Sequence, residues 1–224
     1  MNRQIKRVTI AVLLMFLALF TSTTIITVFQ VDSLNADSRN VRTLYDGYSA
    51  ERGPILVDGQ AIVESKATAD RYKFQRVYNN PQLYSAVTGY FTLNQGNTGV
   101  EGALNNYLSG TANDQFLAKV NSILTGQTPK GGSVSLTIVP KVQQAAWDAL
   151  GNNSGAVVAI NPRTGAILAM VSKAAYDPNL LASHNSNDVI SAYKKLLADP
   201  TRPLINRAIT GDLYHPGSVF KLMT

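Results

Sequence analysis

The sequence predicts an α+β protein in which an N-terminal transmembrane helix is followed by two soluble domains. Three observations lead to this fold class. Residues 8–31 carry no charge and are mostly apolar. Beyond them, short strand-like segments with alternating or continuous apolar residues occur between short amphipathic helical patterns. A Pro-Lys-Gly-Gly run at residues 129–132 then separates two stretches of different composition.

The uncharged N-terminal segment is long enough to cross a hydrocarbon core of roughly 30 Å at about 1.5 Å per residue. Basic residues precede it at Arg3, Lys6 and Arg7, and no acidic residue occurs before Asp32. Basic flanks stay on the cytoplasmic side, which predicts a cytoplasmic tail (1–7), an anchor (8–31) and an extracytoplasmic remainder in a single-pass protein of the cell membrane. A cleaved signal peptide is the alternative, but apolar residues resume after Thr23 and no A-x-A pattern occurs, so we favour an uncleaved anchor.

Composition excludes several classes of function. The net charge is +6, but three of the 20 basic residues lie before the anchor, and the other 17 exceed the 14 acidic residues by only three. No basic stripe with interleaved aromatic residues is present, which argues against nucleic-acid binding. The chain has no cysteine and two distant histidines, His184 and His215, which we expect on surface loops. The sequence implies no metal and no organic cofactor.

The first soluble domain is predicted to cover residues 32–130, including a polar linker at about 32–42. Two short strands flank the turn at Asp58-Gly59, and residues 71–78 alternate as a third strand would. One short helix is predicted from Val100 to Leu108, ending at Gly110, and another from a cap at Asn113 to Leu124. Residues 128–132 form the best candidate for a domain boundary.

The second domain, residues 131–224, begins with a strand-like segment at 133–138 and a helix at 139–150 that stops at Gly151. Residues 156–160 and 166–171 are continuously apolar and are joined by a turn at 161–165, which predicts a hairpin covered on both faces. An amphipathic helix is expected at 187–197.

The last residues of the chain contain the strongest candidate for chemistry. A breaker pair, Pro216-Gly217, precedes Ser218, so a helix starting there would place Lys221 one turn further on the same face. A serine hydroxyl needs a base within roughly 3 Å to act as a nucleophile. Lys221 could be that base if burial and the positive end of the helix dipole lower its pKa from about 10.4. The backbone N–H of Ser218 could also bind an oxyanion.

The S-x-x-K spacing is weak evidence by itself, because a second match occurs at Ser191 and Lys194. That match lies in the middle of the predicted amphipathic helix, with no breaker before it, and we expect Ser191 on the surface. Ser218 differs because a Pro-Gly pair precedes it and apolar residues follow it.

Taken together, several segments make the chain resemble the class B penicillin-binding proteins, and within them the penicillin-binding protein A type of actinobacteria. Residues 51–55 are similar to the family's Arg-Gly segment after the anchor, and residues 98–101 with 108–110 are similar to its Gly-x-Glu segment. Residues 155–179 are similar to the first hairpin of its transpeptidase domain. Residues 206–208 with 214–221 are similar to the approach to its nucleophile.

The resemblance implies a membrane-anchored D,D-transpeptidase that cross-links peptidoglycan stem peptides through an acyl-serine intermediate. Ser218 is then the residue acylated by a stem peptide or a β-lactam antibiotic, and Lys221 its general base. Residues 32–130 become a non-catalytic pedestal domain, and 131–224 the start of a transpeptidase domain with the serine β-lactamase/penicillin-binding-protein fold. Glycosyltransferase, division or elongation proteins are the partners that this family implies.

One departure from the family pattern is that no S-x-N or K-T-G motif follows Lys221, although both belong to the complete site. We therefore expect an N-terminal fragment that does not catalyse by itself. A D,D-carboxypeptidase and a β-lactam sensor or non-catalytic scaffold remain as alternatives. We also expect Glu101 to accept hydrogen bonds from Arg52 or Arg76 within the pedestal, the alternative being that all three are solvated surface charges.

Overall fold

The computed structural model describes residues 3–30, 34, 48–92, 94–112, 130–211, 215 and 217–223. The chain divides into two compact units, Met1–Asp46 and Gly47–Thr224. The helix predicted from Asn113 to Leu124 and almost all of the polar linker at 32–42 lie outside the described residues.

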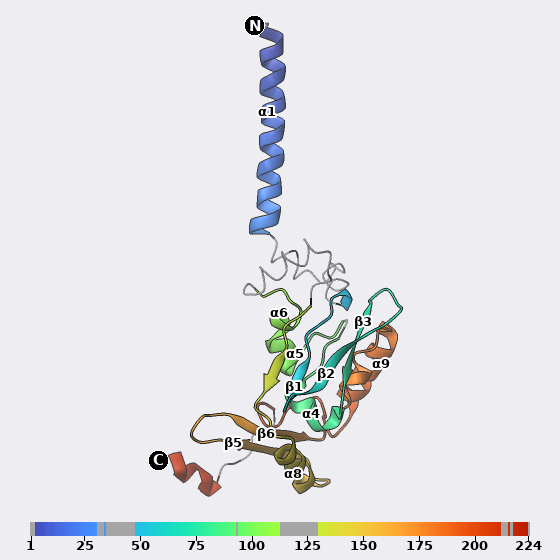
Figure 1. Cartoon of the computed structure of the whole chain (residues 1–224), viewed down its shortest axis with the longest axis vertical. Helices are drawn as coiled ribbons and strands as arrows, with labels where there is room; N and C mark the ends of the chain where they lie inside the picture. Colours follow the sequence, from blue (N-terminus) through green and yellow to red (C-terminus); the bar gives the residue numbers. More distant parts are fainter. Residues whose placement is uncertain are drawn as a thin grey trace. The chain divides into compact units, whose positions relative to one another are not determined.

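The described part of the first unit is dominated by one helix, α1 (Arg3–Thr24), which continues as a π-helical turn, η1 (Ile25–Phe29) (Figure 1). Four threonine hydroxyls donate to the carbonyl four residues earlier, and so need no water: Thr9, Thr21, Thr23 and Thr27. The span Arg3–Phe29 has a mean hydropathy of 2.3 and is long and apolar enough to cross a membrane. The helix is confirmed, while its orientation stays a prediction.

The second unit contains a four-stranded sheet in the order β3-β2-β1-β4. Its strands are β1 (Ile55–Val57), β2 (Gln60–Ala67), β3 (Phe74–Tyr78) and β4 (Val134–Leu136). Neighbours pair antiparallel except β1 and β4, which are parallel. Asp58 and Gly59 both have positive φ, 51° and 75°, as a tight hairpin turn requires, so the predicted turn between β1 and β2 is confirmed.

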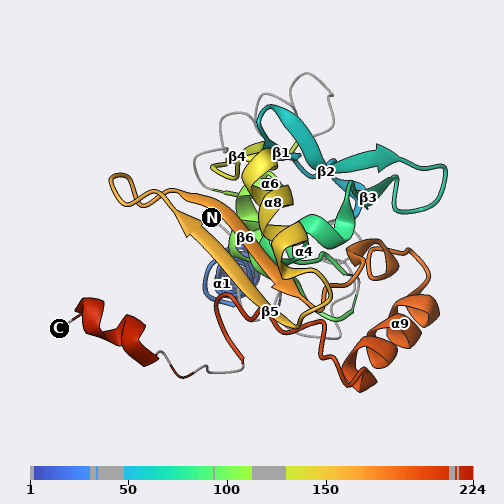
Figure 2. The ribbon, with the colours of Figure 1, turned by 90° about the horizontal axis from the view of Figure 1, so that it is seen from below.

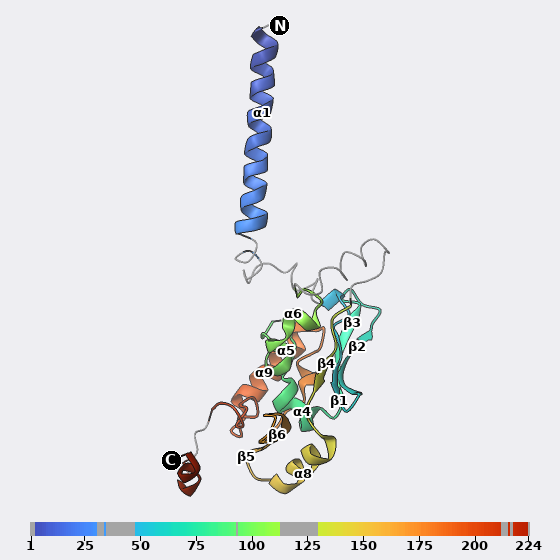
Figure 3. The same cartoon turned by 60° about the vertical axis from the view of Figure 1, so that its left-hand side comes forward.

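Three short helices lie on one side of this sheet: α4 (Pro81–Thr88), α5 (Gly99–Ala103) and α6 (Asn105–Leu108) (Figure 3). The core between the layers includes Ile55, Val63 and Leu108, which are all fully buried. The single helix predicted from Val100 to Leu108 is wrong in one respect, because Leu104 leaves the helical conformation (φ −110°, ψ 26°) and separates α5 from α6. Two glycines weaken the first of these helices.

The glycines of the predicted domain boundary are packed tightly against the first domain. The N–H of Gly131 donates to the carbonyl of Glu51 at 2.8 Å, and a Cβ on Gly131 would lie 1.6 Å from the carbonyl oxygen of Leu108. Just beyond the boundary, β4 joins the sheet beside β1. The domain limits 32–130 and 131–224 stay a prediction.

A helix and a hairpin follow, as predicted: α8 (Pro140–Leu150), β5 (Gly155–Ile160) and β6 (Ile167–Lys173). The helix packs on one face of the hairpin, where Ala146, Ala169 and Val171 are buried (Figure 2). The expectation that both faces are covered is confirmed for β6, where Met170 and Ser172 on the other face are also buried. It is wrong for β5 among the described residues. Because side chains alternate along a strand, Val158 and Ile160 point away from α8, and they are 40% and 56% exposed.

The remaining described elements are η3 (Pro178–Leu180), α9 (Ser186–Ala198) and the 3₁₀ helix η4 (Gly217–Met223). The amphipathic prediction for α9 is confirmed, since Val189 is buried while Ser191 and Lys194 are exposed. The second S-x-x-K match therefore lies on a surface helix.

Candidate functional site

Ser218 and Lys221 both lie in η4, directly after Gly217 at φ 54°. A glycine suits this left-handed position because it has no Cβ to clash with the backbone. A 3₁₀ helix has three residues per turn, so side chains at i and i+3 share one face. Ser218 and Lys221 are spaced in this way, and both are exposed. Their catalytic roles stay a prediction, and Tyr214 and Pro216 of the same motif lie outside the described residues.

The segment that approaches this motif is tied to β6 and α4. The Ser172 hydroxyl on β6 donates to the carbonyl of Ile205 at 3.2 Å and accepts from the N–H of Arg207 at 3.0 Å. The Asn206 side chain donates to the carbonyl of Ala86 in α4 at 2.7 Å. The sequence pointed to residues 206–208 but not to Ser172. This serine is a polar residue within an apolar strand, and nothing in the neighbouring sequence predicts a contact with residues 205–207.

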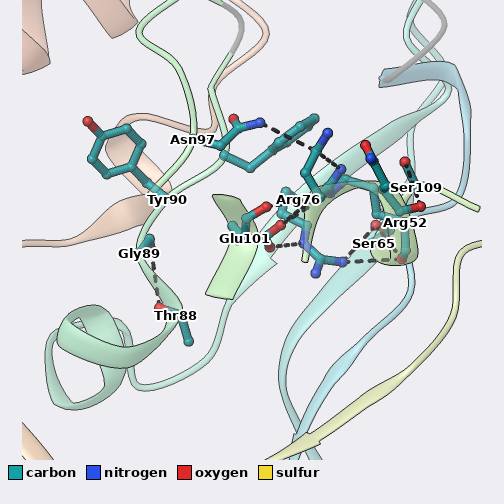
Figure 4. Close-up of polar contacts among 12 residues, drawn as sticks. Arg52, Ser65, Arg76, Thr88, Gly89, Tyr90, Asn97, Glu101 and Ser109 are labelled. Atoms are coloured by element: carbon teal, nitrogen blue, oxygen red, sulfur yellow. Dashed lines mark hydrogen bonds and ion pairs between the residues drawn. The ribbon is translucent and has the colours of Figure 1, made fainter. Parts of the chain in front are cut away.

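A buried cluster of three charged residues lies in the first domain, with Glu101 between Arg52 and Arg76 (Figure 4). Arg52 Nη2 lies 2.7 Å from Glu101 Oε2, and Arg76 Nε lies 2.6 Å from Glu101 Oε1. The three residues are 3%, 2% and 0% exposed, in the order Arg52, Arg76, Glu101. The predicted pairing is confirmed, and the alternative of three solvated surface charges is wrong.

The charges in this cluster do not balance, because one carboxylate faces two guanidinium groups. Arg52 gains further contacts from Asn105 Oδ1, at 2.9 Å, and from the ring of Phe91, whose centroid is 4.0 Å from its Cζ. Burial lowers the pKa of Arg52, and the carboxylate of Glu101 opposes that shift. Arg76 Nη2 is buried without a hydrogen-bond partner in the described part of the chain. Glu101 is therefore the group on which both cations depend.

The two histidines differ in their surroundings. His215 is exposed, as predicted. His184 lies in a loop, as predicted, but it is partly buried: its side chain is only 10% exposed, and its ring lies 4.7 Å from that of Tyr72, between ring centroids. The predicted exposure was wrong because it was based on local sequence, whereas the hairpin that contacts His184 lies more than a hundred positions earlier.

Two family models match this chain. Residues 52–134 match the penicillin binding protein A dimerisation domain, and residues 155–224 match the penicillin binding protein transpeptidase domain. The first match contains β1, β2, β3 and the Arg52–Glu101–Arg76 cluster, and it ends at the first residue of β4. The second contains the β5–β6 hairpin, α9 and η4.

Individual relatives agree with both matches. The peptidoglycan D,D-transpeptidase PbpA of Mycolicibacterium smegmatis is 45% identical over 100% of this chain and 46% of its own length. PbpA of Mycobacterium tuberculosis is 44% identical over the same shares. A solved structure of penicillin-binding protein A from M. tuberculosis, as an imipenem acyl-enzyme complex, superposes with a TM-score of 0.76 at 44% identity, covering 80% of this chain and 42% of that one.

These relatives align with both family-matched parts of the chain. Their sequence identity of 44–45% is well above the level at which only the fold can be inferred. The chain belongs to the class B penicillin-binding proteins, and within them to the penicillin-binding protein A type. It spans about half the length of the curated relatives that it matches.

Proposed function

We propose that the complete protein is a serine D,D-transpeptidase that cross-links peptidoglycan stem peptides. Ser218 Oγ attacks the carbonyl carbon of a D,D-peptide bond in a donor stem peptide, and Lys221 Nζ takes the hydroxyl proton. The terminal D-residue leaves as an amine that receives this proton, and an acyl-serine ester remains. The amine of an acceptor stem peptide then attacks the ester, which forms the cross-link and restores the serine.

The observation that carries this proposal is the position of the S-x-x-K motif inside the match to the transpeptidase domain. The motif lies on one face of a helix, and the match covers residues 155–224. The backbone N–H of Ser218 belongs to the first turn of η4, where N–H groups have no partner within the helix, and in the acylated protein it would serve as one oxyanion donor. β-Lactams would acylate the same oxygen, and the tuberculosis relative has been solved as an imipenem acyl-enzyme complex.

For the membrane, we propose that α1 is an uncleaved anchor with residues 1–7 in the cytoplasm and the second unit outside the cell. The support is the basic flank before an uncharged span. Outside the membrane the second unit would meet stem peptides directly, together with glycosyltransferase, division or elongation proteins.

A second candidate, a β-lactam sensor or a non-catalytic scaffold, is favoured by the match of residues 52–134 to a dimerisation domain. Such a protein would keep Ser218 only as a receptor and would use the pedestal to bind other proteins.

The complete protein, incubated with a D,D-pentapeptide donor and an acceptor amine, distinguishes these functions by mass spectrometry of the products. The transpeptidase proposal predicts an acceptor adduct, lost in Ser218→Ala and retained in the matched control Ser191→Ala. Hydrolysis without transfer would show a carboxypeptidase. Acylation by penicillin with neither product would show a sensor or scaffold.

A further inference from the structure

The outer edge of β3 is covered by side chains from the second family-matched part. β3 is the last strand in the sheet order, so its outward-facing backbone groups need other partners. The N–H of Tyr78 donates to Asn179 Oδ1 at 2.9 Å, and Asn179 Nδ2 donates to the carbonyl of Tyr78 at 3.0 Å. One amide side chain therefore satisfies both backbone groups of Tyr78. Asp177 Oδ1 holds that amide in place, accepting from Asn179 Nδ2 at 2.9 Å.

The same contact continues along the strand. Gln75 Nε2 donates to the carbonyl of Ala182 at 3.0 Å. At the start of β3, His184 Nε2 lies 3.1 Å from the carbonyl oxygen of Phe74. We call residues 177–184 the edge segment. It joins β3, within the match at 52–134, to the part of the chain that leads into α9, within the match at 155–224.

His184 has a hydrogen-bond acceptor in front of each ring nitrogen. A backbone carbonyl can only accept, so Nε2 must carry a proton to bond Phe74. Nδ1 contacts Oδ2 of Asp70, in the loop between β2 and β3. The other carboxylate oxygen, Oδ1, accepts from the Thr68 hydroxyl at 2.9 Å and from the N–H of Tyr72 at 3.0 Å.

The shared proton belongs to the histidine rather than to Asp70. Desolvation would raise the pKa of Asp70, but hydrogen bonds from His184, Thr68 and Tyr72 outweigh it, and the pKa of this carboxyl is lowered. The Asp70 side chain is also 42% exposed, so an ionised carboxylate is well solvated there. With Asp70 ionised, both acceptors are satisfied at once only when both nitrogens of His184 carry a proton, that is, when the ring is an imidazolium.

Among the described residues, the other titratable or charged groups around the ring are Tyr72, Tyr48 and Arg71. The ring of Tyr72 lies 4.7 Å and that of Tyr48 5.9 Å from the ring of His184, between centroids. Burial raises the pKa of Tyr48, so that side chain is a neutral phenol. Arg71 Nη2 donates to the Tyr72 hydroxyl at 2.7 Å, so this cation contacts the tyrosine beside the His184 ring. Asp70 is thus the carboxylate that balances the ring.

We propose that His184 is a proton-dependent clamp that fastens the β2–β3 loop to the edge segment. The imidazolium binds Asp70 and Phe74 at once, and a neutral ring can donate to only one of them. Loss of one proton therefore leaves either a carboxylate facing a lone pair or a carbonyl without its donor. The clamp is closed at lower pH and opens as rising pH removes the second ring proton. The clamp also weakens at very low pH. The pKa of Asp70 is lowered in the folded protein, so the ionised carboxylate contributes fully above the ordinary carboxyl range. That contribution is lost as the pH falls through the lowered pKa and the carboxylate takes up a proton.

Nitrogen-15 spectra of the complete protein, labelled at histidine and recorded from pH 5 to pH 9, test the protonation directly. His184→Gln assigns its signals by their loss. We expect both ring nitrogens of His184 to give protonated signals at pH 5, since each faces a hydrogen-bond acceptor. If His184 shows a single neutral tautomer throughout this range, the proposal is overturned.

Asp70→Asn is the matched variant, because an asparagine amide can donate to a neutral Nδ1 while its oxygen still accepts from Thr68 and Tyr72. In this variant the doubly protonated signal should disappear at lower pH than in the wild type. Hydrogen exchange of the peptides covering residues 70–79 and 177–185, corrected with the β5–β6 peptides, should rise with pH in the wild type and stay level in Asp70→Asn. A rise of equal size in both proteins would contradict the clamp.

Discussion

At the scale of single residues, Glu101 is the charge on which the first domain depends. Its carboxylate is fully buried and contacts both Arg52 and Arg76, so it neutralises part of a site that would otherwise hold two buried cations. Removing one partner of a buried ion pair leaves an uncompensated charge away from water, which costs far more than the loss of a surface pair.

We therefore expect Glu101→Gln, which keeps the size of the side chain, to lower the free energy of unfolding by about 3–5 kcal/mol. Glu64→Gln is the control, since Glu64 pairs with Lys66 on the surface at 3.3 Å, and its loss should cost less than about 1 kcal/mol. Urea unfolding followed by circular dichroism measures both. Equal losses of unfolding free energy in the two variants would show that burial does not determine how much the cluster contributes to stability.

Lys221 gives a prediction of a different kind. Arginine keeps a positive charge of similar reach but does not lose its proton, so Lys221→Arg cannot act as a base. We expect acylation by a fluorescent penicillin to slow by about 10²- to 10⁴-fold in the complete protein. Lys194→Arg, in the surface S-x-x-K match, should leave the rate unchanged. An undiminished rate in Lys221→Arg would remove Lys221 from the role of base.

Single residues were predictable from the sequence only where their setting was unusual. Arg52, Arg76 and Glu101 are charges within apolar or glycine-rich segments, and such charges need partners once they are buried. His184 gave no comparable signal, because Asp70 and Phe74 are more than a hundred positions away and nothing in the local sequence indicates that contact.

At the scale of elements, the glycines around residue 131 allow segments of backbone to pack closely together, in addition to interrupting helices and strands. The N–H of Gly53 donates to the carbonyl of Leu108 at 2.9 Å, and the backbone of Gly131 passes beside both residues. A side chain at Gly131 would meet backbone atoms, which cannot move aside as a flexible side chain can.

Gly131→Ala should consequently destabilise the protein by about 1–3 kcal/mol, as overpacking does. Gly155→Ala is the matched control, because its Cβ would meet only Leu150 Cδ2, at an ordinary 3.5 Å. Thermal unfolding of both variants checks this. A tolerated Gly131→Ala would mean that the backbone at residue 131 does not approach Leu108 and Gly53 as closely as described.

Local patterns predicted most of the described strands and helices. The Asp58-Gly59 turn and the continuously apolar strands of the second hairpin are properties of neighbouring residues, and both hairpins are confirmed. What local patterns could not show is which edges and faces would be covered. Asn179 protects the edge of β3 through a contact spanning a hundred residues, and β5 leaves Val158 and Ile160 exposed among the described residues.

At the scale of the whole second unit, the two family-matched parts are joined at several places. The edge segment covers β3, and the Asn206 side chain bonds to the carbonyl of Ala86 in α4. The approach to Ser218 is therefore held by contacts to the first domain as well as to β6. This arrangement connects the pedestal to residue 206, which precedes the proposed nucleophile in the chain, whereas the sequence indicated only two successive domains.

The most direct test of the proposed function is the site of covalent modification by a penicillin. The complete protein is incubated with the antibiotic, weighed intact by mass spectrometry and then digested to find the modified peptide. We expect one adduct per chain, on the peptide that contains Ser218, absent from Ser218→Ala and unchanged in Ser191→Ala. An adduct that persists in Ser218→Ala, or a wild-type protein that is never acylated, would contradict the assignment of Ser218 as the nucleophile.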